Sequence, residues 1–486
     1  MVFSWFTCSI AVQAQDMAIV ETAAGQTAPP AATAAESIDD PGTGAEEPVT
    51  AEQIQLQQTI YQYADRVLQL EIENGAYNND LVEELTGLGH SYSSMGNHAD
   101  ALKVFSRALH INRINQGLQN MNQIPILDMV IQANNGLSDY KALNDNYGYL
   151  LWVYNRNYGD NNINLAPIYN RVAGWHLDAY EVTPSPDSVG HLVIAANLYS
   201  KAIEIIESYK GPDDPDLITP LYGIVNANFK LVEPYGFIPN IDSFISGKIT
   251  PLLPSNFDSE NQATRFERNS YTALDYNQEH LSRILGDQKS GSSLVQNSYK
   301  SGRNALERIV DIHTKNPDLP TLSHAYALTH LGDWYLRFYK RTSALTNYER
   351  AYQLLKMNGY DFGNNTRGLF GRPQSLDKMK VPDVSSENEP YAFSSLDDTG
   401  DEDPLAELEQ HTSDDKEADS QFVVVEFNVT QYGAVRDLVI IEANPSDSVR
   451  FRRMARNRIS TTPFRPRLED GKPIETENVK MLYRFN

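Results

Sequence analysis

The sequence predicts a multidomain protein in which an all-α stack of helix pairs is followed by a small α+β domain of ββαβ order. Between residues 53 and 360, small and aromatic residues recur at helical spacing. Residues 421–486, in contrast, begin and end with the alternating apolar residues that are typical of strands. Residues 361–420 separate the two parts, because glycine and then acidic residues dominate them.

Residues 1–14 are interpreted as a secretory signal peptide. They are mostly apolar and end in Val12-Gln13-Ala14, and small residues at these positions favour cleavage after Ala14. The basic start of a signal peptide is missing, which a start codon further upstream would explain; the alternative is a short hydrophobic tail. Cleavage would remove Cys8, the one cysteine of the chain, so we expect neither disulfides nor a thiol nucleophile in the mature protein.

Residues 15–52 are expected to be a disordered linker, because Ala, Pro, Thr, Gly and acidic residues leave little apolar surface to bury. The whole chain of 486 residues carries a net charge of −24. Nucleic acid is therefore not expected as a partner, since phosphate binding needs surfaces rich in Lys and Arg. We also find no run of the roughly 20 apolar residues that a membrane-spanning helix needs.

A pattern of small and large residues occurs twice within residues 53–360. Small residues such as Gly89 and Ala101 allow two antiparallel helices to approach closely, and large ones such as Phe105 fill the groove beside them. The order and spacing resemble the tetratricopeptide repeat (TPR) signature, which implies a TPR-like solenoid with a concave surface for a partner. The two copies are Leu85, Leu88, Gly89, Tyr92, Gly96, Ala101, Phe105, Ala108, and Leu328, Leu331, Gly332, Tyr335, Ala344, Tyr348, Ala351.

Between the two copies the chain is helical but less regular. Residues 140–157 and 166–180 are interpreted as one helix pair with Trp152 and Trp175 as core anchors. We expect about five or six helix pairs in all, several of them longer than the usual 34 residues. The other expected elements are a second-helix half at 191–209, a first-helix half at 216–232, a loop at 237–261, and helices at 264–285 and 294–315.

Residues 361–420 are expected to form an acidic linker. From residue 382 to 420 there are fourteen acidic residues and one lysine, and such a run usually stays solvated. A linker of this length favours independent movement of the domains that it joins. The alternative is an acidic tether that folds back on an arginine-rich helix expected near residues 449–459.

Residues 421–486 are expected to fold as strand, turn, strand, helix and strand. The order of these elements, with the motifs FRP at 464–466 and DGKP at 470–473, resembles the C-terminal domain of the TonB energy-transducer family. The resemblance implies a binding mode in which an extended partner segment adds to a sheet edge. The last strand is the candidate edge, with Lys480, Leu482 and Arg484 as partner-binding residues; the alternative is an edge that pairs only within the fold or in a dimer.

Sequence motifs for catalysis or cofactor binding are missing. We find no H-E-x-x-H, paired C-x-x-C, P-loop or G-x-S-x-G sequence. His324 and His330 are six residues apart and do not share a helical face, and His176 beside Trp175 is interpreted as a core residue. We therefore expect no catalytic residue, no metal and no cofactor.

These observations predict a protein that binds other proteins and is not an enzyme. The expected location is the periplasm of a Gram-negative bacterium, and the expected partners are envelope proteins such as outer-membrane receptors. One alternative is a TonB-type energy transducer whose membrane anchor is missing from this sequence; another is a hydrolase built on the helical array. The chain departs from the TonB family in three respects: it lacks the anchor, a long Pro-rich spacer, and a Tyr-Pro pair before the first strand. The oligomeric state is left open.

Overall fold

A computed structural model describes residues 50–182, 189–233, 291–360, 369–376 and 421–485. Residues 52–486 form one compact unit, and residues 1–51 belong to another. The expected signal peptide at 1–14 lies outside the described residues, as do nearly all of the linker at 15–52 and most of the linker at 361–420. The loop expected at 237–261 and the helix expected at 264–285 also lie outside them.

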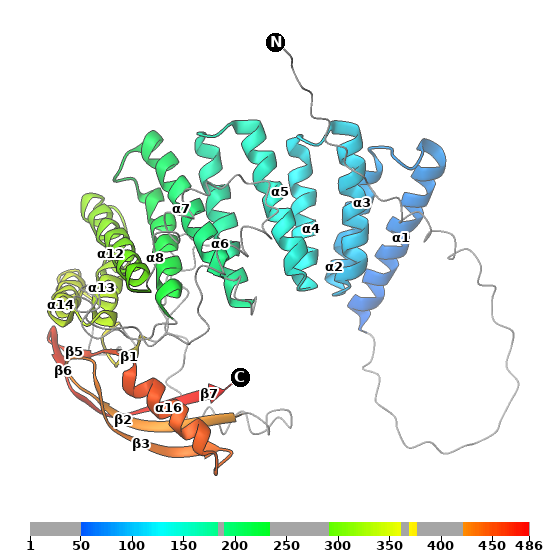
Figure 1. Cartoon of the computed structure of the whole chain (residues 1–486). Coiled ribbons are helices and arrows are strands. Elements are labelled where there is room, and N and C mark those ends of the chain that lie inside the picture. The colour runs from blue at the N-terminus through cyan, green and yellow to red at the C-terminus, as the bar shows by residue number, and fades with distance from the viewer. Residues whose placement is uncertain (1–49, 183–188, 234–290, 361–368, 377–420, 486) are drawn as a thin grey trace, which may run out of the picture. The chain divides into compact units, whose positions relative to one another are not determined.

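The larger part of the described chain is a stack of antiparallel helices (Figure 1). After a single first helix, the helices pack as five successive pairs within the described residues: α2 with α3, α4 with α5, α6 with α7, α8 with α12, and α13 with α14. The prediction of TPR-like helix pairs is thereby confirmed. The bounds are α1 Ala51–Asn74, α2 Leu81–Ser94, α3 His98–Gln116, α4 Ile124–Gly136, α5 Tyr140–Tyr158, α6 Ala166–Val182, α7 Val189–Lys210, α8 Ile218–Val232, α12 Gly291–Lys315, α13 Thr321–Arg337 and α14 Arg341–Met357.

The pairing differs from the prediction at one place. The sequence predicts that residues 140–157 and 166–180 form a pair, but α5 is the second helix of a pair whose first helix is α4, and α6 begins the next pair. α4 was not predicted, because its first turn is apolar on every side and obscures the helical spacing that Leu127, Val130 and Ile131 show. Trp175 is a core residue as expected, whereas Trp152 is only half-buried.

Close helix contacts depend on glycine, as the repeat pattern predicts. A Cβ on Gly89 would lie 2.3 Å from the Phe105 ring, and a Cβ on Gly332 would lie 2.4 Å from the Tyr348 ring. Tyr92 and Tyr335 are half-buried. Nine other residues of the two copies are at most 4% exposed: Leu85, Ala101, Phe105, Ala108, Leu328, Leu331, Ala344, Tyr348 and Ala351. Further contacts of the same kind involve residues outside the predicted signatures, among them Gly223 with Tyr199 and Gly302 with Trp334.

Several helices are followed by the same kind of loop. Gly75, Gly117 and Gly159 follow α1, α3 and α5 at a spacing of 42 residues, and each has a positive φ that glycine adopts without strain. An asparagine near the end of a second helix then donates to a carbonyl in the loop before the first helix of its pair. The bonds are Asn115 to Tyr77, Asn157 to Gln119 and Asn316 to Asp213, at 2.7–2.9 Å. The repeat is therefore longer than 34 residues, as expected.

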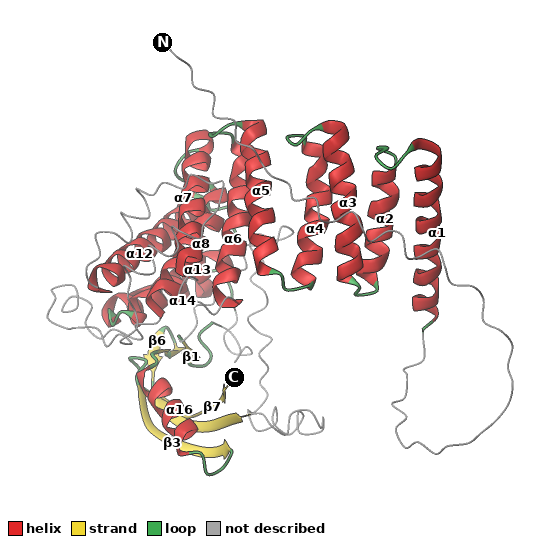
Figure 2. Cartoon of the chain, turned by 45° about the vertical axis from the view of Figure 1, so that its right-hand side comes forward, coloured by secondary structure: helices red, strands yellow, loops and turns green. Residues whose placement is uncertain are grey.

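The C-terminal residues form a three-stranded antiparallel sheet covered on one face by α16 (Figure 2). The strand order is β3-β2-β7. The side chains of Val423, Val425, Phe427 and Val429 share the covered face, where Ile459 of α16 packs against them. Ser448 begins the helix, since its hydroxyl accepts the Phe451 amide at 3.2 Å. The bounds are β2 Gln421–Val429, β3 Val435–Asn444, α16 Val449–Thr461 and β7 Thr476–Phe485.

Four short strands connect this sheet to the helical part, contrary to the expectation of two freely moving domains. β1 (Gln374–Ser375) belongs to the region predicted as a linker, yet it pairs with β4 (Phe464–Arg465). The neighbouring Phe370 is 1% exposed and accepts the amide of Leu468, which belongs to the core of the helices. The part of the linker at 369–376 is therefore packed and not solvated. β5 (Arg467–Glu469) and β6 (Lys472–Ile474) form a hairpin.

Candidate protein-binding surfaces

The strand predicted as a binding edge is an outer strand of the sheet. Among the described strands, β7 pairs with β2 alone. Its pairing is regular from Gln421 opposite Phe485 to Phe427 opposite Val479. An outer strand of this kind presents backbone N–H and C=O groups along its other side, which an added strand can pair with.

The side chains of β7 alternate between two faces, as predicted. Met481 and Tyr483 pack against the core beneath α16. Lys480, Leu482 and Arg484 alternate with them and lie on the opposite face, where Lys480 and Arg484 are exposed and Leu482 is half-buried. The structure thus places the three predicted partner-binding residues on one face of the outer strand.

A buried ion pair holds β4 against α13. Arg465 Nε donates to Asp333 Oδ1 at 2.9 Å and Arg465 Nη2 donates to Asp333 Oδ2 at 2.5 Å. The Tyr348 hydroxyl donates to the same carboxylate at 2.8 Å, and Arg465 Nη1 donates to the Leu369 carbonyl at 3.1 Å. Arg465 and Asp333 are 7% and 8% exposed, so the pair is shielded from water. The bidentate geometry fixes the orientation of the C-terminal domain on the last helix pair.

The electrostatics of this cluster follow from burial and from the Asp333 charge. Burial by itself lowers the pKa of Arg465, but the charge and hydrogen bonds of Asp333 outweigh it and raise that pKa above its ordinary value. Burial, followed by the charge of Asp333, raises the pKa of Tyr348 well above its usual value. Arg465 is therefore charged and Tyr348 is a hydroxyl donor at neutral pH.

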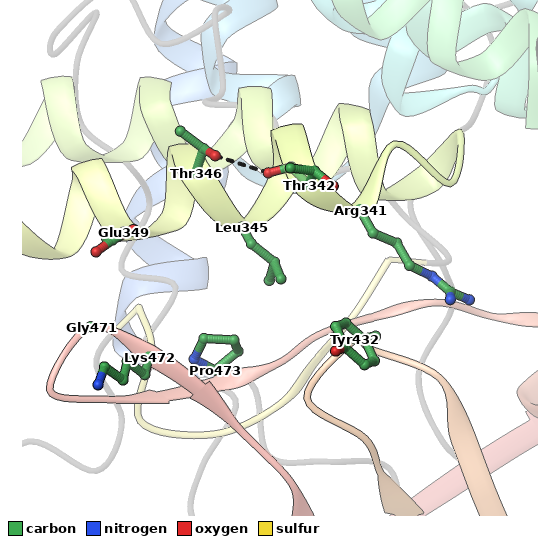
Figure 3. A pocket seen from close by; sticks show the side chains of 9 residues that line it. All are labelled: Arg341, Thr342, Leu345, Thr346, Glu349, Tyr432, Gly471, Lys472 and Pro473. Carbon is green, nitrogen blue, oxygen red and sulfur yellow. Dashed lines mark hydrogen bonds between the residues drawn. The ribbon is translucent and has the colours of Figure 1, made fainter.

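A groove lies between α14 and the β5–β6 hairpin (Figure 3). Its volume is about 570 Å³, and Leu345, Tyr432 and Pro473 provide its apolar part. The two cations Arg341 and Lys472 and the acid Glu349 lie around them. One wall belongs to α14 and the other to the C-terminal domain, so the groove requires that the two stay in contact. Its full lining is Arg341, Thr342, Leu345, Thr346, Glu349, Tyr432, Gly471, Lys472 and Pro473.

Histidines lie in the contacts between helices. His176 Nδ1 is 2.8 Å from His191 Nδ1, so one ring donates and the other accepts. Burial and the neighbouring His191 hold the pKa of His176 well below its usual value. His176 is thus a core residue, as predicted, and His330 is also buried, with its ring 3.0 Å from the Tyr222 hydroxyl. His324 stacks on His313 of the neighbouring helix.

The described residues contain no group of three or more His, Cys, Asp or Glu side chains that could hold a metal ion. One described helix, α7, is long and apolar enough to cross a membrane by length and composition, which the sequence analysis overlooked. It packs between α6 and α8, and 61% of its most apolar window is buried. The apolar composition of α7 is therefore explained by its place in the core of the stack.

Sequence reasoning missed Arg465 and Asp333. In the FRP motif at 464–466, the resemblance depends on Phe464 and Pro466, and Arg465 is the variable position between them. Asp333 follows the repeat glycine Gly332 but does not belong to the repeat signature. An arginine between two core-forming residues could have predicted a buried ion pair, because a charge in such a place needs a buried partner. The sequence does not indicate which acid supplies it, 132 residues away.

No known family model matches the chain, and no curated protein matches it. Solved structures with some similarity are repeat proteins. BtubC (BKLC) from P. vanneervenii is 12% identical, with a TM-score of 0.34, over 63% of this chain and 93% of its own. A kinesin light chain-like protein of Podosopora anserina with nearly identical TPR-like repeats is 9% identical, with a TM-score of 0.35, over 58% of this chain and 99% of its own, and its Q17M variant gives 9%, 0.34, 58% and 98%.

These identities and TM-scores are too low to carry an argument, so the TPR-like architecture rests on the helix pairs themselves. The resemblance of residues 421–486 to the TonB family stays a prediction. The sheet order and the covering helix are properties of this chain, whichever family it belongs to.

Proposed function

We propose that this protein is a non-catalytic scaffold of the bacterial periplasm that joins two protein partners. The helical array binds one of them, as stacked helix pairs with a concave surface commonly do. The outer strand β7 binds an extended segment of the other, an envelope protein, by strand addition. The observation that carries the second part is that the described strands pair β7 on one side only, in a regular ladder from Phe485 to Val479.

β7 is a better template for strand addition than the other outer strand. β3 pairs with β2 through two irregularities, one between Val424 and Val425 and one between Glu426 and Asn428. Such bulges disturb the spacing of backbone donors and acceptors and twist an edge away from partners. β7 is regular over the seven pairs that end at Val479. A partner strand would therefore find a continuous ladder on β7 and an interrupted one on β3.

The side chains of β7 indicate what kind of segment fits. Leu482 is half-buried and lies between the exposed cations Lys480 and Arg484 on one face. A partner segment that matches this face has an apolar residue flanked by acidic ones, because cross-strand pairs of opposite charge stabilise a sheet. The alternative role of the two cations is to protect the edge from unwanted pairing, which is a common use of charge on outer strands.

Site-specific photo-crosslinking tests this proposal. A benzoylphenylalanine at Leu482, introduced in the full chain in Gram-negative cells, is expected to give a crosslink to an envelope protein in the periplasmic fraction. The same group at Val439, which is 58% exposed on β3, serves as the matched control and is expected to give none. Equal crosslinks at both positions, or crosslinks confined to the cytoplasmic fraction, would refute the proposal.

A further inference from the structure

The first helix, α1, is apolar on two opposite sides. One side packs on α2: Val67 is 7% exposed, and Tyr63 lies so close to α2 that a Cβ on Gly87 would meet its ring at 2.5 Å. An ion pair between Arg66 and Glu84 at 3.0 Å supports the same contact. This packed side is the single apolar stripe that a helix on a protein surface usually has.

No described helix or strand covers the second apolar stripe. Its four members are highly exposed: Ile54 at 49%, Tyr61 at 68%, Leu68 at 54% and Ile72 at 76%. At 3.6 residues per turn they fall within about 40° of one another, on the side of the helix away from Tyr63. Single exposed apolar residues are ordinary, but four in one line along a helix are not.

The position of α1 makes the stripe more unusual. α1 is the first described helix of the stack, and α2 and α3 contact it on one side (Figure 1). The outer faces of terminal units in stacked repeats are normally polar, because apolar ones associate. The second apolar stripe of α1 is therefore a candidate binding surface.

We propose that α1 is a self-association surface, which pairs in antiparallel orientation with α1 of a second copy of this chain. Ile54, Tyr61 and Leu68 are spaced by seven residues, the interval at which side chains form a continuous seam between two long helices. Two identical surfaces related by a two-fold axis complement each other without a second patch, which is the commonest way in which soluble chains pair.

Charge selects the antiparallel orientation. In a parallel pair in register, Asp65, which borders the stripe, would lie beside Asp65 of the second copy, and like charges in a seam repel. In an antiparallel pair centred on Tyr61, Ile54 lies against Leu68 of the second copy and Asp65 lies beside Gln57 of the second copy. This register thus places Ile54, Tyr61 and Leu68 against one another and Asp65 of each copy beside an uncharged amide.

The net charge of −24 per copy predicts how salt affects self-association. Two such copies repel each other at long range, and salt screens this repulsion while leaving the apolar seam intact. Self-association through α1 is therefore expected to strengthen as the salt concentration rises. Residues 15–49 are a poorer occupant of the stripe, since Met17, Ile19, Val20, Ile38 and Val49 are their only large apolar residues.

Sedimentation velocity of the full chain over a hundredfold concentration range tests the proposal. The wild-type protein is expected to pass from monomer to dimer, and Tyr61→Glu with Leu68→Glu is expected to weaken the dimer at least tenfold. Met357→Glu on α14, a position that is 78% exposed, is the matched control and is expected to dimerise like the wild type. Unchanged circular dichroism shows that the double variant folds. A monomer at every concentration, or a dimer unaffected by the two glutamates, would overturn the proposal.

Cysteine crosslinking tests the orientation. In a Cys8→Ser background, Ile54→Cys and Leu68→Cys are expected to form a disulfide with each other when the two variants are mixed under mild oxidation with diamide. Neither is expected to crosslink with itself, whereas Tyr61→Cys alone should do so because it lies at the two-fold axis. Self-crosslinking of Ile54→Cys would contradict the antiparallel pair and indicate a parallel one.

Discussion

At the scale of single residues, glycines at helix crossings determine how closely the repeats pack. Gly332 contacts the ring of Tyr348, which itself donates a hydrogen bond to the buried Asp333. A side chain at position 332 would have to displace a ring that is completely buried and hydrogen-bonded. The small residue is thus required by its neighbours and not by its own backbone, since its φ lies in the ordinary helical range.

We predict that Gly332→Ala destabilises the protein by about 1–3 kcal/mol, because overpacking a tight core moves side chains off their preferred positions. Gly148→Ala in α5 is the matched control: a Cβ there meets nothing within 4 Å, so alanine is expected to stabilise the helix by about 0.5–1 kcal/mol. Urea unfolding of both variants measures the two changes. Equal effects of the two substitutions would show that helix propensity, and not the Tyr348 contact, determines the outcome.

At the scale of helices, neutral histidines lie in the seams between repeats. Burial lowers the pKa of His330 to about 4, and burial together with His324 lowers the pKa of His313 to about 4 as well. In the unfolded chain both rings take up a proton near pH 6.5. Between pH 6.5 and 4 the unfolded chain therefore binds protons that the folded protein does not bind.

We predict that stability is insensitive to these two rings above pH 6.5 and falls as the pH drops from 6.5 towards 4. Each such proton costs up to about 1.4 kcal/mol of unfolding free energy per pH unit. Urea unfolding at pH 7, 6 and 5 measures the slope, and His330→Phe is expected to reduce it. A free energy of unfolding that rises as the pH falls from 6.5 towards 4 would contradict this prediction.

The elements themselves were predictable where their side chains have a clear period. The two outer strands and α16 of the C-terminal domain show alternating or four-residue patterns, and the structure has them at those places. α4 was missed because its first turn is apolar all round. For the same reason, α5 was predicted to pair with α6 and not with α4. One missing helix changes the predicted partner of each later helix until the pattern is clear again.

At the scale of the whole molecule, the ion pair of Arg465 with Asp333 joins the C-terminal domain to the helices. We predict that Arg465→Leu destabilises the protein by about 3–5 kcal/mol, because it leaves the Asp333 carboxylate buried without a counter-charge. The double variant with Asp333→Leu is expected to recover most of this loss, since two apolar side chains need no partner. Lys103→Met, which removes an exposed ion pair with Asp100, is the control and is expected to change the stability far less, because solvent screens exposed pairs.

Urea unfolding followed by the fluorescence of Trp334, which lies beside Asp333 in α13, measures these changes. Limited proteolysis within residues 377–420 gives a second readout, because a C-terminal domain that has lost its buried contact is expected to separate from the helices after cleavage. A single variant as stable as the wild type, with the cleaved domain still attached, would show that β1–β4 pairing alone holds the two parts together.

The sequence by itself determined the helical repeats, the small sheet and the absence of a recognisable catalytic motif, because side-chain period, small-residue spacing and motif chemistry are local properties of a chain. Only the tertiary structure decided that residues 369–376 belong to the core, that Arg465 meets Asp333, and that α1 carries a second, exposed apolar face. These features depend on which distant segments lie side by side. The free energy of such contacts depends on residues that are far apart in the sequence. No short stretch of residues predicts these contacts, and they are seen only in the folded chain.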